Sequence, residues 1–376
     1  MSNRPREPFG ELERGRSVAA YAALRYEALS LGELEQVRLV LRGGSAIDWY
    51  RLNFEREDEV EAFARLQGFD VEDARDREYL EQLRTSAVDY LTRVHGYKIP
   101  DEIQHCELFD LPLYASEAMG TRRHRMYSCI LLKVMHITHH VNARELRFRL
   151  PISDATVNGM LVQRVEATAD AMRRLGFPVL DFTGGQKRRD SLIAKLLVKR
   201  DNLAVEIYDR VRFRFVVAEQ GDLVPTIRYL CQHLVPFNYL VPNQTQNDLI
   251  DFTSLLRSHP LYRAYESRLQ IDVNFEERRR AEGPRNEFSG SLYRVINFVA
   301  DVPLVVPDAL LAQLGDGENL GRSVFALAEF QVIDAETARQ NDRGDAAHHR
   351  YKSRQRARER ERLERGMRGR LEFPRL

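Results

Sequence analysis

The chain has 376 residues, of which 43% are hydrophobic and 30% are charged, and this predicts a soluble globular protein with room for two domains. Its 57 basic and 56 acidic residues leave a net charge of +1, which argues neither for nor against nucleic acid as a partner. Three widely separated cysteines and the lack of any long apolar stretch argue against a disulfide framework, a signal peptide and a membrane-spanning helix, so we expect a cytoplasmic protein without membrane contact.

The first part of the chain carries the apolar spacing of helices. Leucines and valines recur at helical intervals over residues 31–41, and Gly43 and Gly44 then mark a typical helix end. The same kind of pattern covers 57–66, 75–94 and 126–150. We therefore predict a mainly helical N-terminal domain over residues 1–150, whose role the sequence does not indicate.

Helix and strand patterns interleave after Pro151. Helices are predicted over residues 154–175, 190–199 and 223–234. Strands are predicted over residues 177–182, 207–218, 291–300 and 324–333. This order predicts an α+β domain with a mixed β-sheet and flanking helices over residues 151–352, followed by an Arg-rich tail over residues 353–376.

A segment rich in glycine and basic residues follows the first of these strands. Gly184 and Gly185 would let the backbone turn tightly, and Lys187, Ser191 and Lys195 lie around the start of the next helix. A helix N-terminus carries free N–H groups and a partial positive charge, so this arrangement indicates a polyphosphate site. The order of a Walker A loop is absent. A solvated helix start with lysines in water would give the same pattern.

Two later strands carry the acidic and amide side chains that a phosphate site needs. Asp209 opens one strand, and Arg212 and Arg214 then project from one of its faces. Glu329 and Gln331 share a face of the other strand. Mg²⁺ takes one or two protein carboxylates together with phosphate oxygens and water, so Asp209 and Glu329 are its candidate ligands. Glu329 could instead accept a proton from a hydroxyl, or simply face water at a sheet edge.

In this order, the motifs resemble those of the RelA/SpoT-type alarmone synthetase domain, a nucleotidyltransferase-like fold. Four motifs of that family are matched: its glycine–lysine–serine–lysine segment, its strand with Asp and Arg, its Ser-Leu-His strand and its Glu-x-Gln strand. The matching residues are, in chain order, Gly184, Lys187, Ser191, Lys195, Asp209, Arg214, Ser291, Leu292, Tyr293, Glu329 and Gln331.

The resemblance implies Mg²⁺-dependent transfer of pyrophosphate from ATP to a ribose 3′-hydroxyl, commonly that of GDP or GTP. It implies that Asp209, Glu329 and Gln331 are catalytic, with Asp209 and Glu329 binding the metal. It implies that the nucleotides contact Lys187, Ser191, Lys195, Arg214, Phe288 and Tyr293. Phe288 would stack on the acceptor base if the loop carried one inserted residue.

The sequence departs from the family pattern mainly on the acceptor side. An arginine usual in the family is replaced by Gly185, the loop over residues 286–293 differs from the Asn-Gly-Tyr-x-Ser-Leu-His text, and the Arg that follows Glu-x-Gln is absent at 332–334. Three alternatives therefore stay open: a nucleotide-binding regulator without catalysis, an enzyme that modifies RNA or tRNA bound through the Arg-rich tail, and an interaction scaffold.

Three histidines of the N-terminal domain have spacing compatible with a metal site. His136, His139 and His140 lie within one predicted helix. No carboxylate follows in the pattern that a metal-dependent hydrolase uses, so a second, hydrolytic domain is not predicted. Buried or surface histidines on a helix give the same pattern.

Overall fold

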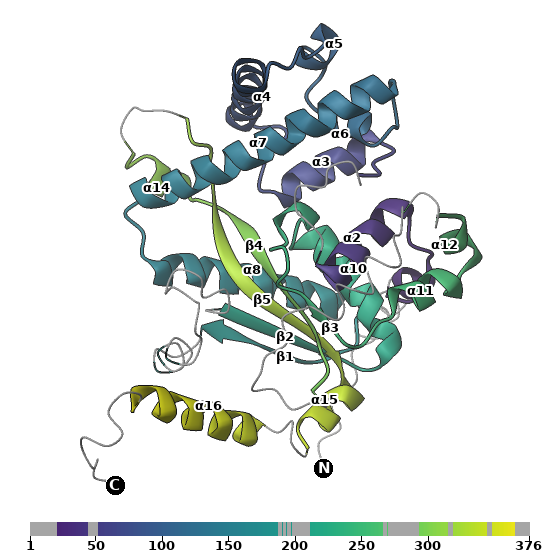
Figure 1. Ribbon diagram of the computed structural model, residues 1–376, viewed down its shortest axis with the longest axis vertical. Coiled ribbons are helices and arrows are strands. Elements are labelled where there is room, and N and C mark those ends of the chain that lie inside the picture. The colour runs from purple at the N-terminus through teal and green to yellow at the C-terminus, as the bar shows by residue number, and fades with distance from the viewer. Residues whose placement is uncertain are drawn as a thin grey trace, which may run out of the picture.

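The computed structural model describes residues 21–43, 52–186, 190, 193, 197, 211–265, 269, 293–314, 319–343 and 348–364. Within this part of the chain the architecture is α+β, as the sequence predicts: helices dominate the first half, and a mixed sheet forms the second (Figure 1).

Most helices of the first half gather at one end of the molecule (Figure 1). They are α3 (Glu57–Leu66), α4 (Ala74–His95), α5 (Asp101–Gln104), α6 (Asp110–Ala115) and the long α7 (Arg122–Arg149). Helix α2 (Leu31–Arg42) begins at Ser30 with a capping box and ends at Gly43 in the left-handed conformation, where glycine is favoured. It lies beside the sheet half, where Glu33 accepts hydrogen bonds from Arg228 and Gln232.

The sheet has five strands in the order β1-β2-β5-β4-β3. Their bounds are β1 Val179–Gln186, β2 Val211–Val217, β3 Gln246–Asn247, β4 Ile296–Val305 and β5 Ser323–Asp334. Strands β2 and β5 are parallel and every other pair is antiparallel, so the predicted mixed sheet is confirmed.

One face of the sheet is the core of this half. Phe213, Phe298 and Phe330 are at most 1% exposed, and the ring of Phe330 stacks at 5.6 Å on Phe213 and at 5.3 Å on Phe298. Helices α8 (Asp154–Arg174) and α10 (Leu223–His233) contact the strands. Each buried ring stabilises the fold by about 2–3 kcal/mol, so this face fixes which residues of each strand point the other way.

The remaining helices connect or follow the strands. They are α11 (Phe252–Ser258), α12 (Pro260–Tyr265), α14 (Asp308–Leu311), α15 (Ala335–Asn341) and α16 (His348–Leu363), with short 3₁₀ turns η3 (Gln220–Asp222) and η4 (Phe237–Tyr239). Among the described residues no helix is long and apolar enough to cross a membrane. All three cysteines are free thiols.

The glycine pair lies inside a strand, where the sequence suggested a tight turn. Gly184 and Gly185 belong to β1 and pair with Phe213 and Arg212 of β2. A Cβ on Gly184 would stand 2.5 Å from Cδ1 of Phe213, so the core ring occupies the space of a side chain. Tertiary packing against Phe213 therefore explains why residue 184 is glycine, and a tight backbone turn does not.

Candidate functional site

Two rows of residues cross the face of the sheet opposite the phenylalanines. Paired residues on neighbouring strands share a face, so the strand register defines both rows. The first row runs across all five strands through Thr183, Arg214, Gln331, Asn297 and Gln246. The second row runs through Gly185, Arg212, Glu329 and Val299. Together they make a polar face with two arginines and one carboxylate at its centre.

The centre of this face is an ion pair between β2 and β5. Arg212 donates from Nε to one carboxylate oxygen of Glu329 at 2.8 Å and from Nη2 to the other at 3.1 Å. Glu329 is only 6% exposed, and a buried carboxylate is costly unless it is paired in this way. The two-pronged geometry fixes the orientation of both side chains.

Three further side chains complete the cluster. Gln331 donates from Nε2 to Glu329 at 3.4 Å. Burial raises the pKa of the Tyr293 phenol, while the positive charges of Arg214 and Arg212 act in the opposite direction. The phenol therefore lies in the field of both guanidinium groups. Among the described residues, the guanidinium group of Arg214 has no hydrogen-bond or ion-pair partner, whereas its backbone pairs with Thr183 and Gln331.

This donor set suits a phosphate with an associated cation. Guanidinium groups bind phosphate oxygens through several N–H groups at once. Glu329 is the one carboxylate in the two rows, and both of its oxygens already accept from Arg212. Mg²⁺ would fit beside it only with further ligands from phosphate and from a second carboxylate, the position that the sequence assigns to Asp209.

The site residues predicted from the sequence divide into two groups. The structure brings together Arg214, Tyr293, Glu329 and Gln331. The remaining five lie outside the described residues: Lys187, Ser191, Lys195, Asp209 and Phe288. The described end of β1 leads directly into the segment that carries the first three, and Asp209 precedes β2 by two residues.

We did not identify from the sequence the amide side chains of Asn297 and Gln246, which lie at one end of the first row. Asn297 pairs with Gln331 on one side and with Gln246 on the other, and its side-chain oxygen is buried without a hydrogen-bond partner among the described residues. The alternation of β4 places Asn297 opposite the buried Phe298, and this signal was readable. Its neighbour Gln246 could not be placed from the sequence, because β3 has only two residues, too few to show an alternating pattern.

Three other regions with functional candidates have structural explanations. The aromatic and amide residues of 236–244 are compatible with either an acceptor pocket or a packed surface loop; this stretch contains η4, whose three residues are buried, so the turn is part of the core. Among the described residues no group of three or more His, Cys, Asp or Glu side chains is placed to hold a metal ion, which includes the three histidines of α7. The Arg-rich end of α16 contacts the protein itself, since Arg362 donates to the Leu197 carbonyl at 2.9 Å.

No protein-family model matches the sequence, and no curated protein matches it either. Solved structures do match. They include small alarmone synthetase 2 from Bacillus subtilis, with 12% identity and a TM-score of 0.30 over 57% of this chain and 96% of that chain. Small alarmone synthetase 1 from the same organism matches with 13% identity and a TM-score of 0.27 over 56% and 92%.

A GTP pyrophosphokinase family protein from Streptococcus pneumoniae matches with 14% identity and a TM-score of 0.27, over 56% of this chain and 88% of that chain. At such TM-scores the likeness decides nothing about the site, so the reaction has to be argued from the residues.

Proposed function

We propose that this chain is an ATP-dependent pyrophosphotransferase that acts on the ribose 3′-hydroxyl of a nucleotide. The observation that carries the proposal is the cluster of Arg212, Arg214, Tyr293 and Glu329 on the polar face of the sheet. It combines the guanidinium group of Arg214, which has no side-chain partner among the described residues, with the oriented carboxylate of Glu329, next to the strand that leads into the lysine- and serine-bearing segment.

In the proposed reaction the acceptor 3′-oxygen attacks the β-phosphorus of ATP. The bond between that phosphorus and the bridging oxygen to the α-phosphate breaks, and AMP leaves. Glu329 takes the proton of the attacking hydroxyl, directly or through a neighbouring water. Arg214 neutralises charge that develops on the transferred group, and Lys187 and Lys195 hold the ATP phosphates.

Mg²⁺ would supply positive charge that neutralises the phosphate groups in this proposal. Asp209 and Glu329 would hold it, and Arg212 would orient the carboxylate of Glu329 by the two hydrogen bonds described above. Gln331 supports the same carboxylate from the neighbouring position of the strand. Most of the rate acceleration would come from positioning, because phosphoryl transfer needs little covalent work from the protein.

The test is a transfer assay on the full chain with ATP labelled at the β-phosphate, Mg²⁺ and a panel of GDP, GTP, AMP and tRNA as acceptors. We expect label on a nucleotide acceptor, and loss of transfer in Asp209→Ala and Arg214→Ala. Glu336→Gln is the matched surface control, because Glu336 forms an exposed ion pair with Arg339. Label on tRNA alone, or transfer that survives Asp209→Ala, would overturn the assignment.

A second candidate is a nucleotide-binding regulator of the same fold without catalysis. It is favoured by one observation: Arg212 occupies both oxygens of Glu329, which leaves the carboxylate less available as a base or metal ligand. Calorimetry separates the two candidates, since a regulator would bind ATP tightly and give no transfer with any acceptor.

A further inference from the structure

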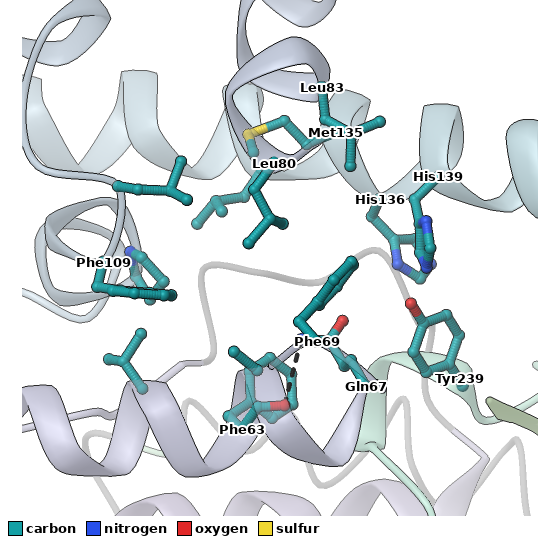
Figure 2. A pocket seen from close by; sticks show the side chains of 15 residues that line it. Phe63, Gln67, Phe69, Leu80, Leu83, Phe109, Met135, His136, His139 and Tyr239 are labelled. Atoms are coloured by element: carbon teal, nitrogen blue, oxygen red, sulfur yellow. Dashed lines mark hydrogen bonds between the residues drawn. The ribbon is translucent and has the colours of Figure 1, made fainter. Parts of the chain in front are cut away.

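A cavity of about 80 Å³ lies among the helices of the first half, away from the polar face of the sheet. Side chains of α3, α4, α6 and α7 form most of its wall, and η4 closes one end (Figure 2). The wall is largely apolar, with Phe63, Phe69, Leu80 and Met135 among its members. A single buried water needs roughly 10–15 Å³, so the cavity has room for a larger occupant.

The polar end of the cavity is formed by His136, His139 and Tyr239 together with Gln67 (Figure 2). No Asp, Glu, Lys or Arg lines it among the described residues. Burial lowers the pKa of both His136 and His139 to about 3, so both rings are neutral at physiological pH. An occupant of this cavity therefore meets no charge.

His139 contributes a buried ring nitrogen to this end of the cavity. Asn142 donates from Nδ2 to the Tyr79 oxygen at 3.1 Å, and the Tyr79 hydroxyl is hydrogen-bonded to Nδ1 of His139 at 3.1 Å. The other ring nitrogen of His139, Nε2, is buried and has no hydrogen-bond partner among the described residues.

Tyr239 supplies a hydroxyl donor at the same end. Its side chain is 2% exposed, and burial raises its pKa well above the ordinary value, so the hydroxyl keeps its proton. The hydroxyl points toward the two histidines in Figure 2 and has no partner among the described residues. A buried donor without a partner is rare in folded proteins because its desolvation is not compensated.

We infer that this cavity is a binding site for a small neutral molecule that presents one hydrogen-bond acceptor, such as a ketone, ester or amide with a compact apolar body. The acceptor oxygen meets the Tyr239 hydroxyl, and the apolar body contacts Phe69, Leu80 and Met135. A carboxylate is disfavoured, because it would be buried beside neutral groups with no counter-charge.

The test compares two molecules of almost equal shape, cyclohexanone and methylenecyclohexane, which differ in an exocyclic oxygen or CH₂. Their dissociation constants for the full chain are measured by ligand-observed NMR titration. We expect the ketone to bind about tenfold more tightly, the effect of one or two hydrogen bonds. Tyr239→Phe should reduce that ratio to about threefold or less and leave the affinity for the hydrocarbon unchanged.

Two further variants make the outcome decisive. Ala64→Leu places a larger side chain in the wall and should weaken both ligands by at least about tenfold, while Tyr90→Phe, at an exposed tyrosine of α4, should change neither. Equal affinity for both molecules, a ratio that Tyr239→Phe leaves intact, or no binding of either molecule would overturn the inference. The last result would mean that ordered water satisfies the Tyr239 hydroxyl.

Discussion

The polar face of the sheet and the polar end of the helical cavity bury hydrogen-bonding groups in opposite ways. On the sheet, Glu329 and Arg212 carry opposite charges and are joined by two hydrogen bonds. In the cavity, His139 and Tyr239 are neutral, and each keeps one polar atom without a partner among the described residues. The charged side chains on the sheet suit a charged ligand, and the neutral side chains in the cavity suit a neutral one. The charge state of the buried groups therefore distinguishes the two sites.

The largest effect that would test this comparison is acid destabilisation through the histidines. Burial lowers the pKa of His136 and His139 to about 3 and that of His140 to about 4, so the unfolded chain binds protons that the folded chain does not. Stability is therefore full above about pH 6.5 and falls as the pH decreases below it, by about 1.4 kcal/mol per pH unit for each histidine.

One carboxyl group acts in the opposite direction. Burial raises the pKa of Asp301 to about 7, so the folded chain holds a proton there that the unfolded chain releases, and stability from this group increases as the pH falls from 7 toward 4. The net loss between about pH 6.5 and pH 4.5 is then on the order of 4 kcal/mol. Urea unfolding at several pH values measures it. His139→Phe should reduce the slope, whereas His105→Gln, at an exposed side chain, is the control.

The next effect concerns catalysis on the sheet. Glu329→Gln keeps the shape of the side chain and removes its charge, so we expect kcat to fall at least about 100-fold while the affinity for ATP changes little. The folded state should lose about 1 kcal/mol or less, because Arg212 is partly exposed. A variant with normal kcat and reduced stability would show that the ion pair is structural, and the polar face would then resemble the cavity in having no charge-dependent role.

The strands of this face were predictable where one side is buried and the other is not. Residues 211–217 and 324–332 carry buried phenylalanine, valine or alanine at every second position, so their type and their outward residues follow from the sequence. Glu329, Gln331 and Arg214 were found in this way. Their pairing was not, because a register between strands more than a hundred residues apart depends on packing that no local pattern contains.

The cavity was even less predictable from the sequence, because it too depends on long-range packing. The sequence indicated that three histidines share a helix, and α7 confirms it. Tyr239 completes the polar end of the cavity together with these histidines. It belongs to a 3₁₀ turn about a hundred residues later, in a stretch whose aromatic and amide residues suggested a surface pocket or loop. Local composition could not distinguish a buried turn from an exposed loop. The neutral state of the histidines also depends on this long-range burial.

A smaller effect tests the packing that separates the two faces of the sheet. Gly184→Ala would place a Cβ 2.5 Å from Cδ1 and 2.9 Å from Cε1 of Phe213, whose ring is fully buried against Phe330. We expect a loss of about 1–2 kcal/mol in the free energy of unfolding, measured with urea. Gly159→Ala is the control, since an added Cβ in α8 meets nothing within 4 Å and should stabilise the helix by about 0.5–1 kcal/mol.

The smallest effect compares two buried tyrosines that differ only in their partners. Tyr79 is 1% exposed and its hydroxyl is hydrogen-bonded to Asn142 and His139, whereas Tyr239 is 2% exposed and its hydroxyl has no partner among the described residues. Tyr79→Phe should lower the free energy of unfolding by about 1 kcal/mol. Tyr239→Phe should raise it by up to about 1 kcal/mol, because an unsatisfied polar group is removed. Thermal unfolding without added ligand measures both. Equal losses in the two variants would mean that the Tyr239 hydroxyl is already satisfied by bound water, and the cavity would then be a hydrated part of the core.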